Sequence, residues 1–179
     1  MIYKIENNSD SILRSVEHVL KRKCIIKKNK SIEFQATNFE KFEKQKVSEK
    51  DLLCFAESLF SQILFLEKME RKCFIKLDTN YLFLVDDSIL LYINETDLFS
   101  LSMDDKDKNI LINSTFDKTL TSFIAPEVNE VREIPCKVPA NVAIYSLGLF
   151  LQSLLQNEIK TPIYYFVLRC IKNRIFLYV

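Results

Sequence analysis

The chain has 179 residues and a formal net charge of +1, which favours a single domain and argues against binding to nucleic acid or membranes through overall charge. Its cysteines, at positions 24, 54, 73, 136 and 170, include no CxxC pair, so we expect reduced thiols rather than a zinc site or a disulfide framework. The longest apolar stretch, residues 142–155, is shorter than the ~18 residues that cross a bilayer, and we expect an intracellular protein, cytoplasmic or nuclear.

The first half of the chain predicts two amphipathic helices. Ser9 or Asp10 can cap a helix whose apolar residues follow at helical spacing up to Leu20. Residues 30–46 have no firm period and predict a short strand or a loop. Ser48 then opens a Ser-x-x-Asp capping box before a wide apolar stripe that continues to about Met69. We expect this second helix to belong to the core.

Three short apolar runs follow, and the last two predict a β-hairpin over residues 81–93, with its turn at Asp86-Asp87-Ser88. Residues 101–109 predict a polar, acidic loop, and residues 110–112 another short strand. Residues 113–140 contain three of the four prolines and predict a long irregular segment.

Two helices are predicted at the end of the sequence. Residues 141–156 are apolar nearly all round, which predicts a buried helix. Its glycine, Gly148, costs about 1 kcal/mol relative to alanine and therefore indicates close packing at that point. Thr161 and Pro162 have the character of an N-cap and first position for the last helix.

Two stretches resemble parts of the protein kinase C-terminal lobe. Residues 122–128, SFIAPEV, resemble the end of an activation segment, and residues 145–151, YSLGLFL, resemble the opening of the central buried helix. Asn80 with the apolar residues after it resembles the catalytic-loop asparagine and its strand, and residues 168–174, LRCIKNR, resemble the late helix with its arginine. The resemblance implies a structural role for Pro126 and Gly148 and an ion pair between Glu127 and Arg174.

The catalytic parts of a kinase do not accompany this resemblance. If Asn80 is the catalytic-loop asparagine, the position of the catalytic aspartate is Ile75, which cannot accept a proton. The single glycine excludes a G-x-G-x-x-G loop, and no V-A-I-K lysine strand is recognisable. Ala143 also replaces the aspartate that braces the catalytic loop in kinases. We therefore expect no catalytic residues, no metal and no cofactor.

A kinase C-terminal lobe without an N-terminal lobe resembles the KIND domain, a non-catalytic module of Spir actin nucleators and some signalling proteins. The resemblance implies a mainly α fold with short β-hairpins, in class α+β, without a complete N-terminal lobe. The resemblance covers about residues 11–176. We expect one domain over residues 1–179, with a divergent N-terminal helix and extension over 1–47 and the core lobe over 48–179. KIND domains bind short helical peptides, so the implied function is that of a pseudokinase-like binding or regulatory scaffold.

The expected partner is another protein, either a basic helical peptide or a protein kinase that this module regulates or mimics. Acidic residues are the candidate contacts for a basic partner; they are Asp86, Asp87, Asp97, Asp104, Asp105 and Asp107. Two alternatives remain open. One is a residual ATP-binding phosphotransferase. The other is a nucleic-acid-associated protein that uses the basic run 21–30, although this run lacks interleaved aromatic residues for base stacking.

Overall fold

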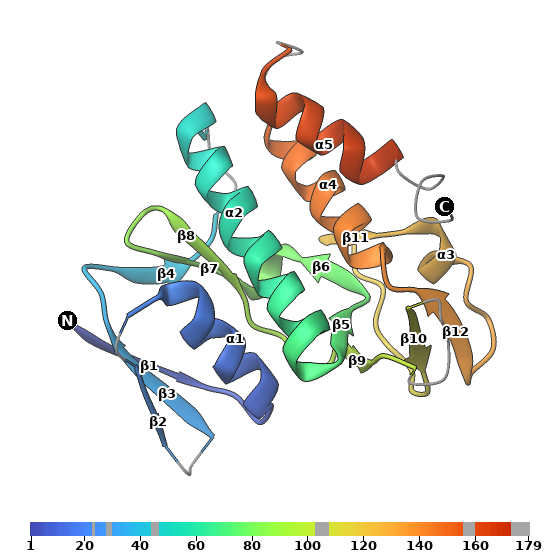
Figure 1. Ribbon diagram of the computed structural model, residues 1–179, viewed down its shortest axis with the longest axis horizontal. Helices are drawn as coiled ribbons and strands as arrows, with labels where there is room; N and C mark the ends of the chain where they lie inside the picture. Colours follow the sequence, from blue (N-terminus) through green and yellow to red (C-terminus); the bar gives the residue numbers. More distant parts are fainter. Residues whose placement is uncertain (23, 28–29, 44–46, 103–107, 156–159, 173–179) are drawn as a thin grey trace.

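The computed structural model describes residues 1–22, 24–27, 30–43, 47–102, 108–155 and 160–172 (Figure 1). The structure is a mixed α+β fold, in which 41% of the described residues are helical and 28% lie in strands. The prediction of a mainly α fold was therefore wrong. The reason is that many strands of three to five residues pair over long sequence separations, and such short strands leave little periodicity in the sequence.

The N-terminal part contains a small sheet, of which the sequence predicted only a short strand or loop within residues 30–46. Its elements are β1 (Ile2–Glu6), α1 (Asp10–Leu20), β2 (Cys24–Lys27) and β3 (Ser31–Gln35). The strands form an antiparallel sheet in the order β1-β3-β2, and β1 buries only Ile5, which explains its weak pattern. The predicted first helix is confirmed, with the Ser9 hydroxyl accepting a hydrogen bond from the Ile12 amide.

The second predicted helix is also confirmed, as α2 (Glu49–Phe65) followed by the π-helical turn η1 (Leu66–Glu70). The Ser48 hydroxyl oxygen accepts from the Asp51 amide at 3.2 Å, and the same hydroxyl lies 2.6 Å from the Asp51 carboxylate. The predicted cap by the Ser48 hydroxyl is therefore confirmed. The second contact differs from that of a capping box, because the Asp51 carboxylate accepts from the Ser48 hydroxyl where a capping box uses the Ser48 amide.

The predicted hairpin consists of β7 (Leu82–Val85) and β8 (Ile89–Tyr92), and β4 (Phe39–Lys41) joins it in the order β4-β7-β8. Asp86 and Asp87 both have positive φ values, 49° and 57°. Two consecutive left-handed residues match the twist of a hairpin, and aspartate tolerates this conformation better than most residues. The turn chemistry therefore agrees with the sequence prediction.

Three two-stranded sheets and two short helical turns are formed by other elements between Lys72 and Pro139. The elements are β5 (Lys72–Phe74), β6 (Lys76–Asp78), η2 (Thr79–Tyr81), β9 (Leu98–Ser100), β10 (Asn109–Ile112), β11 (Ser122–Ile124), α3 (Pro126–Asn129) and β12 (Cys136–Pro139). β5 pairs with β9, β6 with β11, and β10 with β12, all antiparallel. The strand predicted at 110–112 is confirmed. The prediction of an irregular segment over 113–140 is confirmed for most of these residues, but β11, α3 and β12 interrupt the segment.

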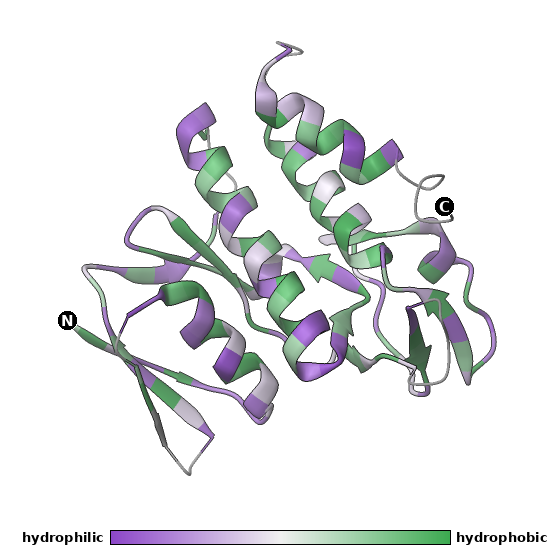
Figure 2. Cartoon of the chain, in the orientation of Figure 1, coloured by the Kyte–Doolittle hydropathy of each residue, from purple (hydrophilic) through white to green (hydrophobic). Residues whose placement is uncertain are grey.

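The two last helices are α4 (Val142–Leu154) and α5 (Pro162–Lys172), which lie side by side (Figure 1). Hydrophobic residues recur along α4 (Figure 2), and this helix packs against α2, β6, β11 and α5. The predicted cap is confirmed, because the Tyr164 amide donates to the Thr161 hydroxyl. Within the described residues, no helix has both the length and the apolar character that crossing a membrane requires.

Candidate functional site

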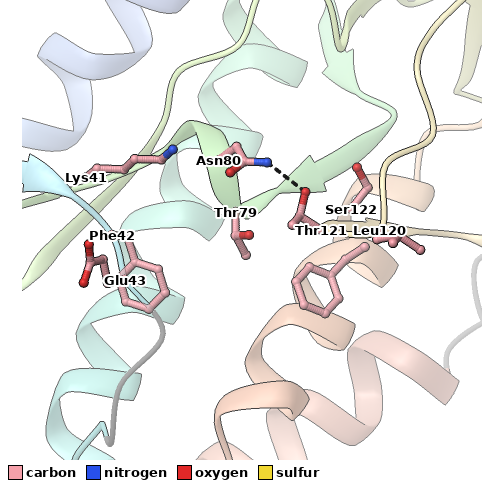
Figure 3. A pocket seen from close by; sticks show the side chains of 9 residues that line it. Lys41, Phe42, Glu43, Thr79, Asn80, Leu120, Thr121 and Ser122 are labelled. Atoms are coloured by element: carbon pink, nitrogen blue, oxygen red, sulfur yellow. Dashed lines mark hydrogen bonds between the residues drawn. The ribbon is translucent and has the colours of Figure 1, made fainter.

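A pocket of about 450 Å³ lies where the end of β4, the turn η2 and the loop before β11 meet (Figure 3). It is lined by Lys41, Phe42, Glu43, Thr79, Asn80, Leu120, Thr121, Ser122 and Phe123. Its volume is in the range of sites that hold small molecules or the side chains of a peptide. Its lining combines apolar side chains, hydroxyl groups and one amide with a cation and an anion.

The apolar part of the pocket is held in place by the two central helices. Phe42 is buried and contacts Phe55 of α2 and Phe150 of α4, with ring centroids 5.7 and 5.8 Å apart. Phe123 contacts the same Phe150 at 5.7 Å. These edge-to-face contacts fix the two rings, so this part of the pocket is preformed.

The polar part of the pocket rests on the buried carboxylate of Asp78, at the end of β6. Its Oδ1 accepts from the backbone amide of Asn80 at 2.9 Å and from the Thr121 hydroxyl at 2.8 Å. Its Oδ2 accepts from the Thr119 hydroxyl at 2.7 Å and the Ser122 hydroxyl at 3.2 Å. Asp78 therefore ties the loop before β11 to η2, and the chain's own donors occupy both of its oxygens.

A second buried carboxylate, Asp97, lies behind Asp78. The Lys76 ammonium is 3.5 Å from Asp97 Oδ1, and the side chains of Lys76 and Asp97 are only 3% and 1% exposed. Lys76 also donates to the carbonyl of Asp117 and lies 3.5 Å from the Ser122 hydroxyl. Since an ammonium group has three donors, these contacts use all of them.

The hydroxyl of Tyr92 connects the carboxylate of Asp97 to the backbone of Asp78. It donates to Asp97 Oδ2 and accepts from the backbone amide of Asp78 at 3.3 Å, while Asn94 donates to the same Asp97 oxygen at 2.8 Å. Burial raises the pKa of Tyr92, and the neighbouring Asp97 charge raises it further. The tyrosine is therefore a neutral hydrogen-bond donor at ordinary pH.

The pKa values of the two carboxyls shift in opposite directions. For Asp97, burial is the largest effect and raises the pKa, although Tyr92 and Lys76 oppose it. For Asp78, burial also opposes ionisation, but the hydrogen bonds from Thr119, the Asn80 amide, Thr121 and Ser122 together outweigh it and lower the pKa. Asp78 is thus a carboxylate that the fold stabilises in its charged form.

Asp78→Asn is expected to lower the free energy of unfolding by about 1–2 kcal/mol at neutral pH, because an amide nitrogen replaces an oxygen that accepts hydrogen bonds. A carboxyl whose pKa is lowered on folding stabilises the folded state above its unfolded pKa of ~3.9, and this contribution is lost as the pH falls through the lower folded value. The deficit of the variant should therefore shrink below about pH 4 in urea titrations. Asp117→Asn, an exposed change in the same loop, is the control, and an equal deficit at every pH would contradict the prediction.

The acidic residues that were predicted to contact a partner lie in different environments in the structure. Asp86 accepts from the Thr37 amide and pairs with Arg22 at 2.7 Å, while exposed Asp87 accepts from Asn38. Burial opposes the ionisation of Asp86, but Arg22 and the amides of Thr37 and Asn38 keep its pKa below the usual value.

Asp97 is buried, so its prediction as a surface contact was wrong. Asp104, Asp105 and Asp107 lie outside the described residues, and Asp86 and Asp87 stay predictions.

The predicted structural residues have different outcomes. A Cβ atom on Gly148 would lie 2.7 Å from Cys170 Cβ and 3.0 Å from Ile171 Cγ1, so the predicted close packing is confirmed. Pro126 is the first residue of α3. Glu127 lies in the first turn of the same helix, but Arg174 lies outside the described residues, and their ion pair stays a prediction.

The remaining predicted features are the cysteines and the basic run 21–30. All five cysteines are free thiols, and Cys73 and Cys170 are buried. No group of three histidine, cysteine or acidic residues within the described part of the chain could hold a metal ion. In the basic run 21–30, Arg22 is engaged with Asp86 and with the carbonyl of Gln35.

Sequence reasoning missed the network of Lys76, Asp78, Asp97 and Tyr92. One available signal was the pair Lys76 and Asp78, two charged residues inside an otherwise apolar run. Charged residues are rarely buried unless they are paired, so this pair could have marked a polar network. No family model matches the chain, and no curated protein matches it.

Proposed function

We propose that this chain is a catalytically inactive, pseudokinase-like or KIND-like module that acts by protein–protein interaction at the pocket between β4, η2 and β11. The order of elements supports this proposal. A core helix, a hairpin, a short helix at Ala-Pro-Glu and a buried helix follow one another as α2, β7-β8, α3 and α4, which is the order that the resemblance implies. The five free thiols support the intracellular location, cytoplasmic or nuclear, that we include in the proposal.

The observation that carries the proposal is that the charged groups beneath the pocket form hydrogen bonds and an ion pair with residues of their own chain. Asp78 accepts four hydrogen bonds from its own chain, and Lys76 and Asp97 pair with each other in the interior. A general base must reach a substrate proton with a free lone pair. Neither carboxylate meets this requirement, and Ile75, at the position that the resemblance gives to the catalytic base, is fully buried. These groups serve to hold the pocket.

The surface around the pocket has the character of a protein-binding site. Leu120 is fully exposed at its edge, the half-buried ring of Phe123 supplies apolar area, and Lys41 and Glu43 lie at its exposed side. An apolar anchor surrounded by polar groups is the usual composition of an interface centre. The partner that we propose is a short helical peptide, or the peptide-like segment of a protein kinase.

Selection from a random peptide display library tests the binding function. We expect peptides that bind the wild-type chain and lose at least about tenfold in affinity for Leu120→Asp, because this change places a charge where an apolar contact forms. Leu111→Asp is the matched control, since Leu111 is an exposed leucine on β10, outside the pocket. Equal losses in both variants, or peptides that ignore Leu120, would contradict binding at this pocket.

A thermal-shift titration with ATP and magnesium tests the inactive character of the module. Any ligand that binds the folded state alone must raise its apparent stability. We expect no shift with nucleotide at concentrations up to about 1 mM, where a ligand of micromolar affinity would stabilise by several kcal/mol. A clear shift would favour the residual phosphotransferase instead.

A further inference from the structure

We propose that the pocket also binds a second copy of this chain, with Leu120 of each copy inserted into the pocket of the other. This inference rests on the proposed function, because it names one partner for the same binding site. The resulting contact is isologous: the same surface is used twice about a two-fold axis. Three features of the pocket, its exposed leucine, its apolar interior and its charge pattern, lead to this occupant.

The first feature is the exposed leucine itself. Leu120 is completely exposed, and its exposed fraction is the highest among the large apolar side chains of the described residues. It lies in the loop that Asp78 fastens through Thr119, Thr121 and Ser122. A fixed loop that presents a bare leucine is unfavourable in water and becomes favourable when the side chain is buried. The fixed position also lowers the entropy lost on association.

The second feature is that the acceptor for such a leucine lies on the same surface. The pocket has a volume of about 450 Å³ and contains apolar rings of Phe42 and Phe123, which is ample for one leucine side chain. A projecting group and a matching cavity at one place are what a two-fold contact requires, because each copy must supply both.

The third feature selects a second copy over a simple charged peptide. Lys41 and Glu43 are both exposed beside the pocket, two residues apart on one segment (Figure 3). A uniformly basic partner would face Lys41, and a uniformly acidic one would face Glu43, so each would meet a like charge. A second copy related by a two-fold axis runs in the opposite direction and can place its Glu43 opposite Lys41 and its Lys41 opposite Glu43.

Analytical ultracentrifugation over a concentration range from about 10 µM to about 500 µM tests the proposal, because a contact of this small size should have a weak dissociation constant. We expect a reversible dimer for the wild-type chain and at least about tenfold weaker association for Leu120→Asp, with Leu111→Asp unchanged. A monomer at every concentration would overturn the proposal. A dimer that Leu120→Asp leaves intact would also overturn it, because the contact would then lie elsewhere.

Charge reversal gives a sharper test of the reciprocal arrangement. Lys41→Glu alone and Glu43→Lys alone should each weaken the dimer several-fold, since each homodimer then carries two like-charge contacts. An equimolar mixture of these two variants should associate about as well as the wild type, because every contact in the mixed dimer again joins opposite charges. A mixture that associates no better than either variant alone would overturn the reciprocal contact.

These measurements distinguish this inference from the proposed function. If the chain is monomeric but still binds selected peptides through Leu120, the second-copy contact is wrong and the binding module stands. If both proposals hold, a peptide that depends on Leu120 must dissociate the dimer as it binds, because the two occupants share one site. A peptide that binds at this pocket and leaves the dimer intact would overturn the second-copy contact.

Discussion

Asp97→Asn is expected to lower the free energy of unfolding by about 3–5 kcal/mol, because it leaves the Lys76 ammonium without its charged partner in the interior. Both side chains are almost completely buried, at 3% and 1% exposed. The substitution is nearly isosteric, and the new amide can still accept one hydrogen bond from Tyr92 or Asn94. The decrease in the free energy of unfolding therefore results from the lost charge and not from a change of packing. Urea denaturation at neutral pH measures it.

The companion variant Lys76→Met decides whether the loss comes from the pair. Methionine has a similar length and no charge, so the double variant Lys76→Met/Asp97→Asn contains no unpaired buried charge. We expect the double variant to be markedly more stable than the sum of the two single losses predicts, by at least about 1–2 kcal/mol. Additive losses would show that Lys76 and Asp97 are not coupled, and that their pairing does not help to hold the pocket.

The helices and the hairpin could be predicted from sequence because their signals are local. Ser9, Ser48 and Thr161 each cap a helix with a hydroxyl that contacts a residue three positions later, and such caps need no distant partner. The two left-handed aspartates of the β7-β8 turn are local in the same sense. These elements could therefore be predicted from neighbouring residues alone.

The small sheets and the site depend on distant pairings. β6 pairs with β11, more than forty residues later, over only three residues of each strand. Asp78 obtains its hydroxyl partners from the same distant segment. A three-residue strand is too short to show the alternating pattern of a β-strand. The sequence around Asp78 also does not show which distant residues donate hydrogen bonds to it. This explains why residues 113–140 had the character of an irregular segment, although they supply one wall of the pocket.

The same dependence on distant contacts explains why the acidic contact residues could not be predicted reliably. Six aspartates were grouped by charge alone, because a sequence shows which residues are acidic and not which are enclosed. Asp97 lies between β8 and β9, and the fold buries it against Lys76. Asp86 is held by Arg22 from the N-terminal sheet. The acidic residues are thus divided between internal and surface roles by tertiary contacts.

Gly148→Ala is expected to lower the free energy of unfolding by about 2–3 kcal/mol, although alanine is the better helix former by about 1 kcal/mol. The added Cβ atom would lie 2.7 Å from Cys170 Cβ and 3.0 Å from Ile171 Cγ1. The Cβ of Cys170 is attached directly to the backbone of α5 and cannot rotate away, so the helix itself must move. Thermal and urea unfolding measure the loss, and a more stable variant would contradict the close approach of α4 and α5.

A rescue variant identifies the colliding atom. Cys170→Gly removes the Cβ atom that the new methyl group meets, at the cost of a glycine within α5. The double variant Gly148→Ala/Cys170→Gly should therefore be more stable than the sum of the two single losses predicts, whereas Cys54→Gly, a thiol on α2 away from this contact, should add its loss independently. Since α4 also positions Phe150 beneath Phe42 and Phe123, a forced movement of this helix should reach the pocket. Peptide binding should then fall in Gly148→Ala and return with the rescue.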